Sequence, residues 1–179
     1  DSVIISATLS AAHGEETVIY FSTGGTASYD LDYELNFLGK GKANKISSFT
    51  GQSIYVDNLN NVFVGNTHSV RKWIPGAQEG VIVAGGSGYG SGDTELHGVE
   101  GIVVDSEGNL FIADSKNNRI QKWAPGASEG TTVAGNNGEF NRIVGLVIDD
   151  LDQLYIADAG NYSIQKWIPG STSTTIVAG

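Results

Sequence analysis

The amino-acid sequence predicts an all-β fold built from repeated four-stranded units. Three observations lead to this prediction: one segment recurs three times, each copy holds four short β-rich runs, and glycine greatly outnumbers proline. The chain of 179 residues contains 25 glycines and 3 prolines, and 40% of its residues are hydrophobic. This composition is typical of a globular protein with many short strands joined by tight turns.

The three tryptophans mark the repeat. Trp73, Trp123 and Trp167 each stand in a Trp-x-Pro-Gly element, and they lie 50 and 44 residues apart. A Val-Ala-Gly element begins ten residues after each tryptophan. Upstream, an apolar run ends in an aspartate in every copy, at Asp57, Asp105 and Asp149. Such self-similarity at a near-constant spacing indicates a repeat architecture.

The second copy shows the expected strands most clearly. Its β-rich runs lie near residues 101–105, 109–114, 119–124 and 130–134, and turn sequences separate them. Four short strands in a repeat of about 40–50 residues are typical of a β-propeller blade. The run Ile102-Val103-Val104 is apolar at consecutive positions, which predicts a strand covered on both faces.

This copy resembles the NHL-repeat family. The run from Gly101 to Ile120 is close to the family pattern of Gly-h-x-h-Asp, Gly-Asn, h-Ala-Asp and Asn-x-Arg-Ile, where h is apolar. The resemblance covers about residues 45–179. It implies three four-stranded NHL-type blades of an incomplete propeller, at about 45–84, 98–134 and 142–179, within a domain spanning 38–179. Two copies depart from the pattern, because Asn66 replaces the aspartate of the first copy and Ser163 replaces the arginine of the third.

Residues 1–37 do not carry the repeat. Strands are expected at residues 7–10 and 18–21, and the run that follows them resembles the later part of a Calx-beta domain, a β-sandwich of extracellular or adhesive proteins. This resemblance implies a short, partial β-sandwich-like fragment. Some members of that family bind calcium, which makes Asp30 and Asp32 calcium candidates, but a solvated hairpin turn is the simpler explanation of these two residues. No other cofactor is expected.

Composition narrows the possible partners. Twenty acidic and ten basic residues give a formal net charge of -10, which opposes binding to nucleic acid. The chain has no cysteine, which excludes a disulfide framework and a cysteine-ligated zinc site. It also has no apolar run long enough to span a bilayer. It begins at Asp1 without a signal-peptide pattern and contains no methionine, so we expect a segment of a longer protein. Three blades leave open strand edges, which predicts that further blades or an oligomeric partner complete the ring.

Several motifs have a simpler structural explanation than a chemical one. The glycine-rich run 85–92 lacks the Gly-Lys-Ser/Thr of a phosphate loop and is expected to link two blades. The recurring aspartates are expected to accept hydrogen bonds from turn amides, with a calcium loop as the alternative. The three tryptophans are expected to pack between blades, with a sugar-stacking platform as the alternative.

The candidate ligand-binding residues lie in loops that open on one face of a propeller, around its central channel. These loops are residues 66–69, 86–100, 115–118 and 159–163. The candidates in or beside them are His68, Asp93, Glu95, His97, Glu100, Asp114 and Asp158. The Asp114–Arg119 pair also has a structural interpretation, as the pair that closes the hairpin.

These observations favour a non-enzymatic binding or scaffold module of a larger secreted or cell-surface protein. The Trp-x-Pro-Gly and Val-Ala-Gly elements resemble a bacterial subgroup of such repeats, which implies a bacterial protein. The ligand would be a protein or a carbohydrate. The alternative is a metal-dependent lyase or hydrolase of the NHL-propeller type, since some such propellers hold a metal with histidines and acidic residues. His68 and His97 lack a third imidazole, and no serine or cysteine stands in a nucleophile motif.

Overall fold

The structure, a computed structural model, describes residues 4–10, 16–22, 33–35, 44–45 and 53–179. Its strands form four antiparallel sheets of four strands each. The described residues contain no α-helix, only the 3-10 helices η1 (Ser115–Asn117) and η2 (Ala159–Asn161). The prediction of an all-β fold is therefore confirmed. Neither of these short helices could cross a membrane.

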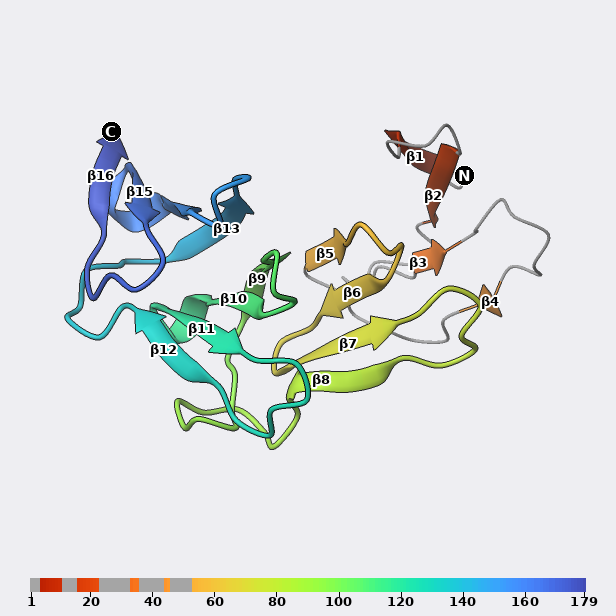
Figure 1. Cartoon of the computed structure of the whole chain (residues 1–179), viewed down its shortest axis with the longest axis horizontal. Helices are drawn as coiled ribbons and strands as arrows, with labels where there is room; N and C mark the ends of the chain where they lie inside the picture. Colours follow the sequence, from red (N-terminus) through yellow and green to blue (C-terminus); the bar gives the residue numbers. More distant parts are fainter. Residues whose placement is uncertain (1–3, 11–15, 23–32, 36–43, 46–52) are drawn as a thin grey trace.

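Three of the sheets are the expected blades, and each is an up-and-down meander (Figure 1). Blade one consists of β5 (Ser53–Val56), β6 (Val62–Gly65), β7 (Ser69–Trp73) and β8 (Val81–Gly85). Blade two consists of β9 (Val99–Val104), β10 (Leu110–Asp114), β11 (Arg119–Trp123) and β12 (Thr131–Ala134). Blade three consists of β13 (Ile143–Ile148), β14 (Leu154–Asp158), β15 (Ser163–Trp167) and β16 (Thr175–Ala178).

The fourth sheet contains β1 (Ile4–Ser10), β2 (Glu16–Ser22), β3 (Tyr33–Leu35) and β4 (Asn44–Lys45), paired in that order. The strands expected at residues 7–10 and 18–21 lie within β1 and β2. The sheet continues past residue 37, because β4 pairs with β3. Asp30 and Asp32 lie outside the described residues, so the calcium site and the Calx-beta resemblance both stay predictions.

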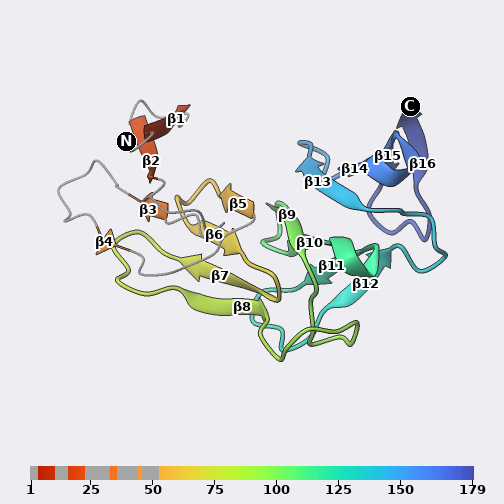
Figure 2. The same cartoon turned by 180° about the vertical axis from the view of Figure 1, so that it is seen from behind.

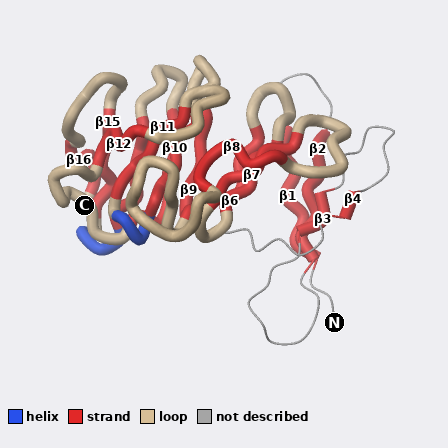
Figure 3. Tube along the Cα trace, turned by 90° about the horizontal axis from the view of Figure 1, so that it is seen from below, coloured by secondary structure: helices blue, strands red, loops and turns tan. Residues whose placement is uncertain are grey.

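The three blades stack side by side as sectors of an open arc (Figures 1 and 2). Their first strands, β5, β9 and β13, lie on the inner side of the arc, and β9 contacts both of the others. Gly101 in β9 leaves no room for a side chain, because a Cβ there would lie 2.8 Å from the Cβ of Leu146 in β13. In a view turned by 90°, loops project at both ends of the strands, and η1 and η2 lie at the same end (Figure 3).

The hydrophobic core lies between neighbouring blades. One cluster joins blades one and two and includes Phe63, Val70, Ile102, Leu110, Ile112 and Trp123. A second cluster joins blades two and three and includes Val103, Phe111, Ile120, Leu154, Ile156 and Trp167. Blade two thus buries one apolar face against blade one and the other against blade three.

The tryptophans of blades two and three pack between blades, as expected. Trp123 and Trp167 are buried in these clusters, and the Trp167 ring lies 5.7 Å from the ring of Phe111 in the preceding blade. Gly130 makes room for Trp123, because a Cβ at this glycine would lie 2.5 Å from the indole ring. The Trp-x-Pro-Gly element therefore encodes a contact between blades.

Blade three exposes the apolar face that blade two buries. Val147 is 63% exposed, whereas Val103 at the same position of blade two is 4% exposed. Ile164 is 36% exposed, whereas Ile120 is fully buried. The difference follows from the arc, since no described residue covers the far side of blade three. The propeller is incomplete.

The repeated aspartates form turns, which confirms their structural interpretation. In blade two, Asp105 Oδ1 accepts hydrogen bonds from the backbone N–H groups of Glu107 (3.0 Å) and Asn109 (2.7 Å). Asp57 and Asp149 accept the corresponding bonds in blades one and three. The carboxylate thus satisfies amides that the tight turn would otherwise leave unpaired.

The turn of Asp149 has a pH-dependent consequence. Burial alone would raise the pKa of Asp149, but the N–H groups of Gln153 and Leu151, the Tyr155 hydroxyl and the Lys166 charge together hold this pKa below its usual 3.8. The folded state therefore favours the carboxylate, and this contribution to stability is present above the unfolded-state pKa. It is lost as the pH falls through the lower folded-state pKa.

We expect an NMR titration of the Asp149 side-chain carboxyl carbon to give a midpoint below 3.8. In the Tyr155→Phe variant, which removes one donor, the midpoint should move upward. A midpoint at or above 3.8 in the unmodified protein would contradict this account of the turn.

Candidate functional site

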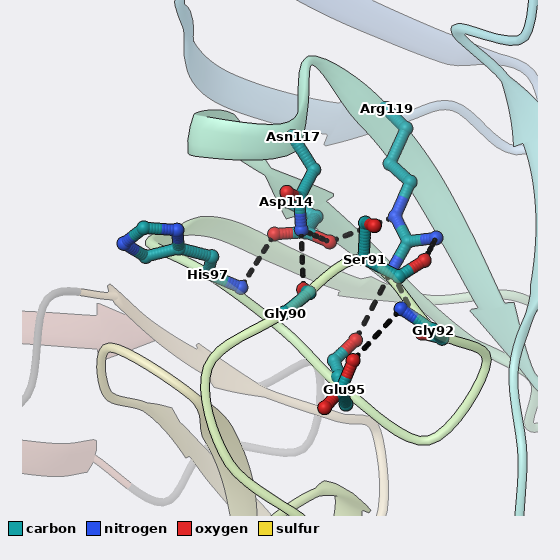
Figure 4. Close-up of polar contacts among 8 residues, drawn as sticks. All are labelled: Gly90, Ser91, Gly92, Glu95, His97, Asp114, Asn117 and Arg119. Carbon is teal, nitrogen blue, oxygen red and sulfur yellow. Dashed lines mark hydrogen bonds and ion pairs between the residues drawn. The ribbon is translucent and has the colours of Figure 1, made fainter.

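The end of blade two where β10 meets β11 is organised by a buried ion pair (Figure 4). Asp114 is the last residue of β10 and is fully buried. Its carboxylate accepts hydrogen bonds from the backbone N–H of His97 (2.7 Å), the amide of Asn117 (2.8 Å) and Nε of Arg119 (2.8 Å). The expected pairing of Asp114 with Arg119 is confirmed.

Arg119 extends this network to the linker that enters blade two. Its guanidinium donates to the carbonyl oxygens of Ser91 (2.7 Å), Gly92 (3.1 Å) and Glu95 (3.1 Å). Hydrogen bonds from a charged donor are stronger than those between neutral groups. The ion pair therefore fixes the backbone of residues 91–97, a segment that belongs to no strand or helix.

Blade three repeats the arrangement with a glutamine in place of the arginine. Asp158 is also fully buried and accepts hydrogen bonds from the backbone N–H of Asn141 (2.9 Å), the amide of Asn161 (2.7 Å) and the amide of Gln165 (2.8 Å). Asn161 and Gln165 also donate to the carbonyl oxygen of Glu139. Gln165 compensates for Ser163, which stands at the position of Arg119.

The linker held by Arg119 places an aromatic cluster on the surface, which we call the Tyr89 cluster: His68, Tyr89 and His97. The Tyr89 ring lies 4.8 Å from the His68 ring and 5.7 Å from the His97 ring. Both separations are typical of favourable aromatic pairs. Tyr89 is 62% exposed, and Nδ1 of His68 is buried without a hydrogen-bond partner among the described residues. The structure thus brings together the two histidines that the sequence singled out.

The other candidate residues have different surroundings. Asp93 is exposed, and its carbonyl oxygen accepts a hydrogen bond from Gly130. The Glu95 carboxylate accepts one from the N–H of Gly92 (3.0 Å) and so closes a turn of the linker. Glu100, in β9, lines a cavity of about 330 Å³ between blades two and three. The carboxylates of Asp114 and Asp158 are engaged by the loop contacts described above.

Within residues 53–179, no three histidine or acidic side chains come together as a set that could hold a metal ion. The rings of His68 and His97 each pack against the Tyr89 ring.

Sequence reasoning did not single out Tyr89. The available signal was its isolation, because every other residue of the run 85–92 is glycine or serine. A large side chain among glycines and serines is expected to be exposed, because its neighbours in the sequence are too small to cover it.

The fold and this loop face define an incomplete β-propeller, a class whose ligands contact the loops between strands and blades. The NHL repeat model matches residues 96–123 and 140–167, in blades two and three. These matches support the resemblance of the chain to the NHL β-propeller family. No curated protein matches the chain.

Solved structures show the same fold at low sequence identity. The crystal structure of a nidogen/laminin complex matches with a TM-score of 0.67 and 17% identity, over 90% of this chain and 60% of that one. An auxiliary nutrient binding protein from Bacteroides thetaiotaomicron VPI-5482 matches with a TM-score of 0.60 and 18% identity, over 84% and 45%. Streptogramin B lyase matches with a TM-score of 0.60 and 13% identity, over 99% and 59%. The chain spans less than two thirds of each.

Proposed function

We propose that this chain is a non-enzymatic binding module of a larger secreted or cell-surface bacterial protein, and that it contacts a protein or carbohydrate through the Tyr89 cluster. The observation that carries the proposal is an exposed tyrosine whose ring packs against two imidazoles, on a linker fixed by a buried ion pair. Tyrosine supplies a large contact area with little conformational entropy to lose, and a fixed loop reduces the ordering cost of binding.

Two of the comparisons support a binding role. The nidogen/laminin structure is a complex between proteins, and the Bacteroides structure is described as a nutrient binding protein. Further blades of the parent chain, or an oligomeric partner, would cover the exposed face of blade three. The negative formal charge argues against a nucleic-acid partner.

The alternative is a metal-dependent lyase or hydrolase, and it is favoured by the similarity to streptogramin B lyase. In this alternative, His68 and His97 would be metal ligands together with acidic residues of the same face. The two proposals differ in their expectation for the tyrosine. A binding surface depends on the Tyr89 ring itself, whereas a metal site depends on the imidazoles.

The proposals are separated by screening the purified chain against a glycan array and a panel of extracellular proteins that includes laminin. We expect Tyr89→Ala to weaken any binding by at least about tenfold, which corresponds to about 1.4 kcal/mol. Leu59→Ala, which changes an exposed apolar residue in the turn between β5 and β6, is the control and should bind like the unmodified chain.

Metal analysis of the same protein tests the alternative. A stoichiometric metal that is lost in His68→Ala and His97→Ala would overturn the binding proposal in favour of the enzyme. Binding that survives Tyr89→Ala but is lost in Leu59→Ala would show that the binding surface lies at the opposite end of the blades.

A further inference from the structure

Two basic side chains differ from the other five within residues 53–179. Residues 53–179 contain seven lysines and arginines. Five are engaged: Lys72, Lys122 and Lys166 lie over aromatic rings, Arg71 donates to the carbonyl oxygen of Gly80, and Arg119 pairs with Asp114. The charged groups of Lys116 and Arg142 have no such contact with a described residue. Both side chains are exposed.

Arg142 also has an unusual backbone conformation. Its φ is +64°, in the left-handed region that side chains with a Cβ disfavour. The equivalent residue of blade two is Gly98, with φ +82°. The equivalence is shown by matching hydrogen bonds, since Ser115 N–H donates to the Gly98 carbonyl (2.9 Å) and Ala159 N–H donates to the Arg142 carbonyl (3.1 Å). An arginine therefore occupies a position that suits glycine, and retained strain of this kind is frequently associated with function.

The two unengaged cations line the same cavity. Lys116 and Arg142 meet there with Asn118, Asn141, Ser115 and Glu100, around a volume of about 330 Å³. This volume lies within the range of small-molecule sites, about 300–1,000 Å³. The side chain of Asn118 helps to hold the cavity in shape, because its Oδ1 accepts a hydrogen bond from the Arg142 N–H (2.8 Å). The cavity is distinct from the Tyr89 cluster, because the two share no residue.

The lining defines the chemistry of a ligand. Two cations and one carboxylate give the cavity a net charge of one positive unit, which a single carboxylate would neutralise. Glu100 would repel a dianion such as phosphate, but it can accept hydrogen bonds from hydroxyl groups. The amides of Asn118 and Asn141 and the hydroxyl of Ser115 can bond to further hydroxyls. A small molecule that carries one carboxylate and several hydroxyl groups matches this set.

We propose that this cavity binds a uronate, a sugar whose carboxylate lies between the Lys116 ammonium and the Arg142 guanidinium and whose hydroxyls contact Glu100 and the asparagines. Arginine suits the carboxylate because its planar fork can donate two parallel hydrogen bonds. The proposal goes beyond the binding role assigned to the Tyr89 cluster and uses different residues.

Calorimetric titration of the purified chain with sodium glucuronate and sodium galacturonate tests the proposal. We expect saturable binding to at least one uronate that is at least about tenfold tighter than binding to glucose, galactose or acetate. Added salt should weaken uronate binding, because dissolved ions screen the attraction between the carboxylate and the exposed charges of Lys116 and Arg142. Arg142→Gly should weaken uronate binding by at least about tenfold and should leave the melting temperature equal or higher, since glycine relieves the strained φ. Lys116→Gln should weaken binding in the same direction.

Lys72→Gln is the control with the same change of charge, because Lys72 lies in blade one, and Tyr89→Ala is the control for the other site. Both should bind the uronate normally. Absence of uronate binding, equal binding of acetate or phosphate, or unchanged binding in Arg142→Gly would each overturn the proposal. Uronate binding that is lost only in Tyr89→Ala would also overturn it, and would assign the sugar to the Tyr89 cluster.

Discussion

Replacement of Trp123 by alanine is expected to lower the free energy of unfolding by about 3–5 kcal/mol, the usual cost of removing a large buried aromatic side chain. Trp123 is 2% exposed and packs in the cluster that joins blades one and two. Its loss would leave a cavity that Gly130, which has no side chain and lies against the indole, could not fill. Urea denaturation followed by circular dichroism measures the effect.

Ile74→Ala is the control for this experiment. Ile74 directly follows Trp73 in blade one and is 58% exposed, so its truncation should change the free energy of unfolding by less than about 0.5 kcal/mol. A comparably small loss in Trp123→Ala would show that the indole does not hold the blades together.

Replacement of Asp114 by asparagine is expected to have a similarly large effect, a loss of about 3–5 kcal/mol. The variant keeps the shape of the side chain but leaves the buried guanidinium of Arg119 without its counter-charge. The three carbonyl oxygens that Arg119 holds belong to the linker, so this linker should become the first segment to be cut in limited proteolysis.

Asp158→Asn is the matched control, because Asp158 has the same position in blade three but contacts only neutral donors. Loss of charge there should cost only about 1 kcal/mol, since an asparagine oxygen can still accept hydrogen bonds. Equal effects of the two substitutions would mean that the ion pair with Arg119 contributes nothing beyond a neutral hydrogen bond.

The blades could be predicted from the sequence, because each copy of the repeat contains the residues that form its own strands and contacts. Both ends of every strand expected in the second copy lie within two residues of β9 to β12. The sequence predicts that the strand of Ile102-Val103-Val104 is covered on both faces, and Val103 is buried. The equivalent Val147 of blade three is exposed, because coverage depends on a neighbouring blade. Residue patterns within one copy carry no information on whether that neighbour is present.

The candidate site was only partly predictable, for a related reason. His68 and His97 could be placed on the same face from the repeat alone, but their common contact, Tyr89, depends on the path of a glycine-rich linker. Arg119 sets that path through carbonyl oxygens 24 to 28 residues away in the sequence. Backbone acceptors have no sequence signature, so this clamp could not be inferred from residue types.

The central claim is that tryptophan-anchored four-stranded units pack against one another as propeller blades. A NOESY spectrum of the chain with labelled aromatic residues tests it most directly, because Trp167 and Phe111 belong to different blades and their ring centres are 5.7 Å apart. We expect cross-peaks between the protons of these two rings. Cross-peaks from Trp167 to residues of blade three alone, in a folded chain, would contradict the claim.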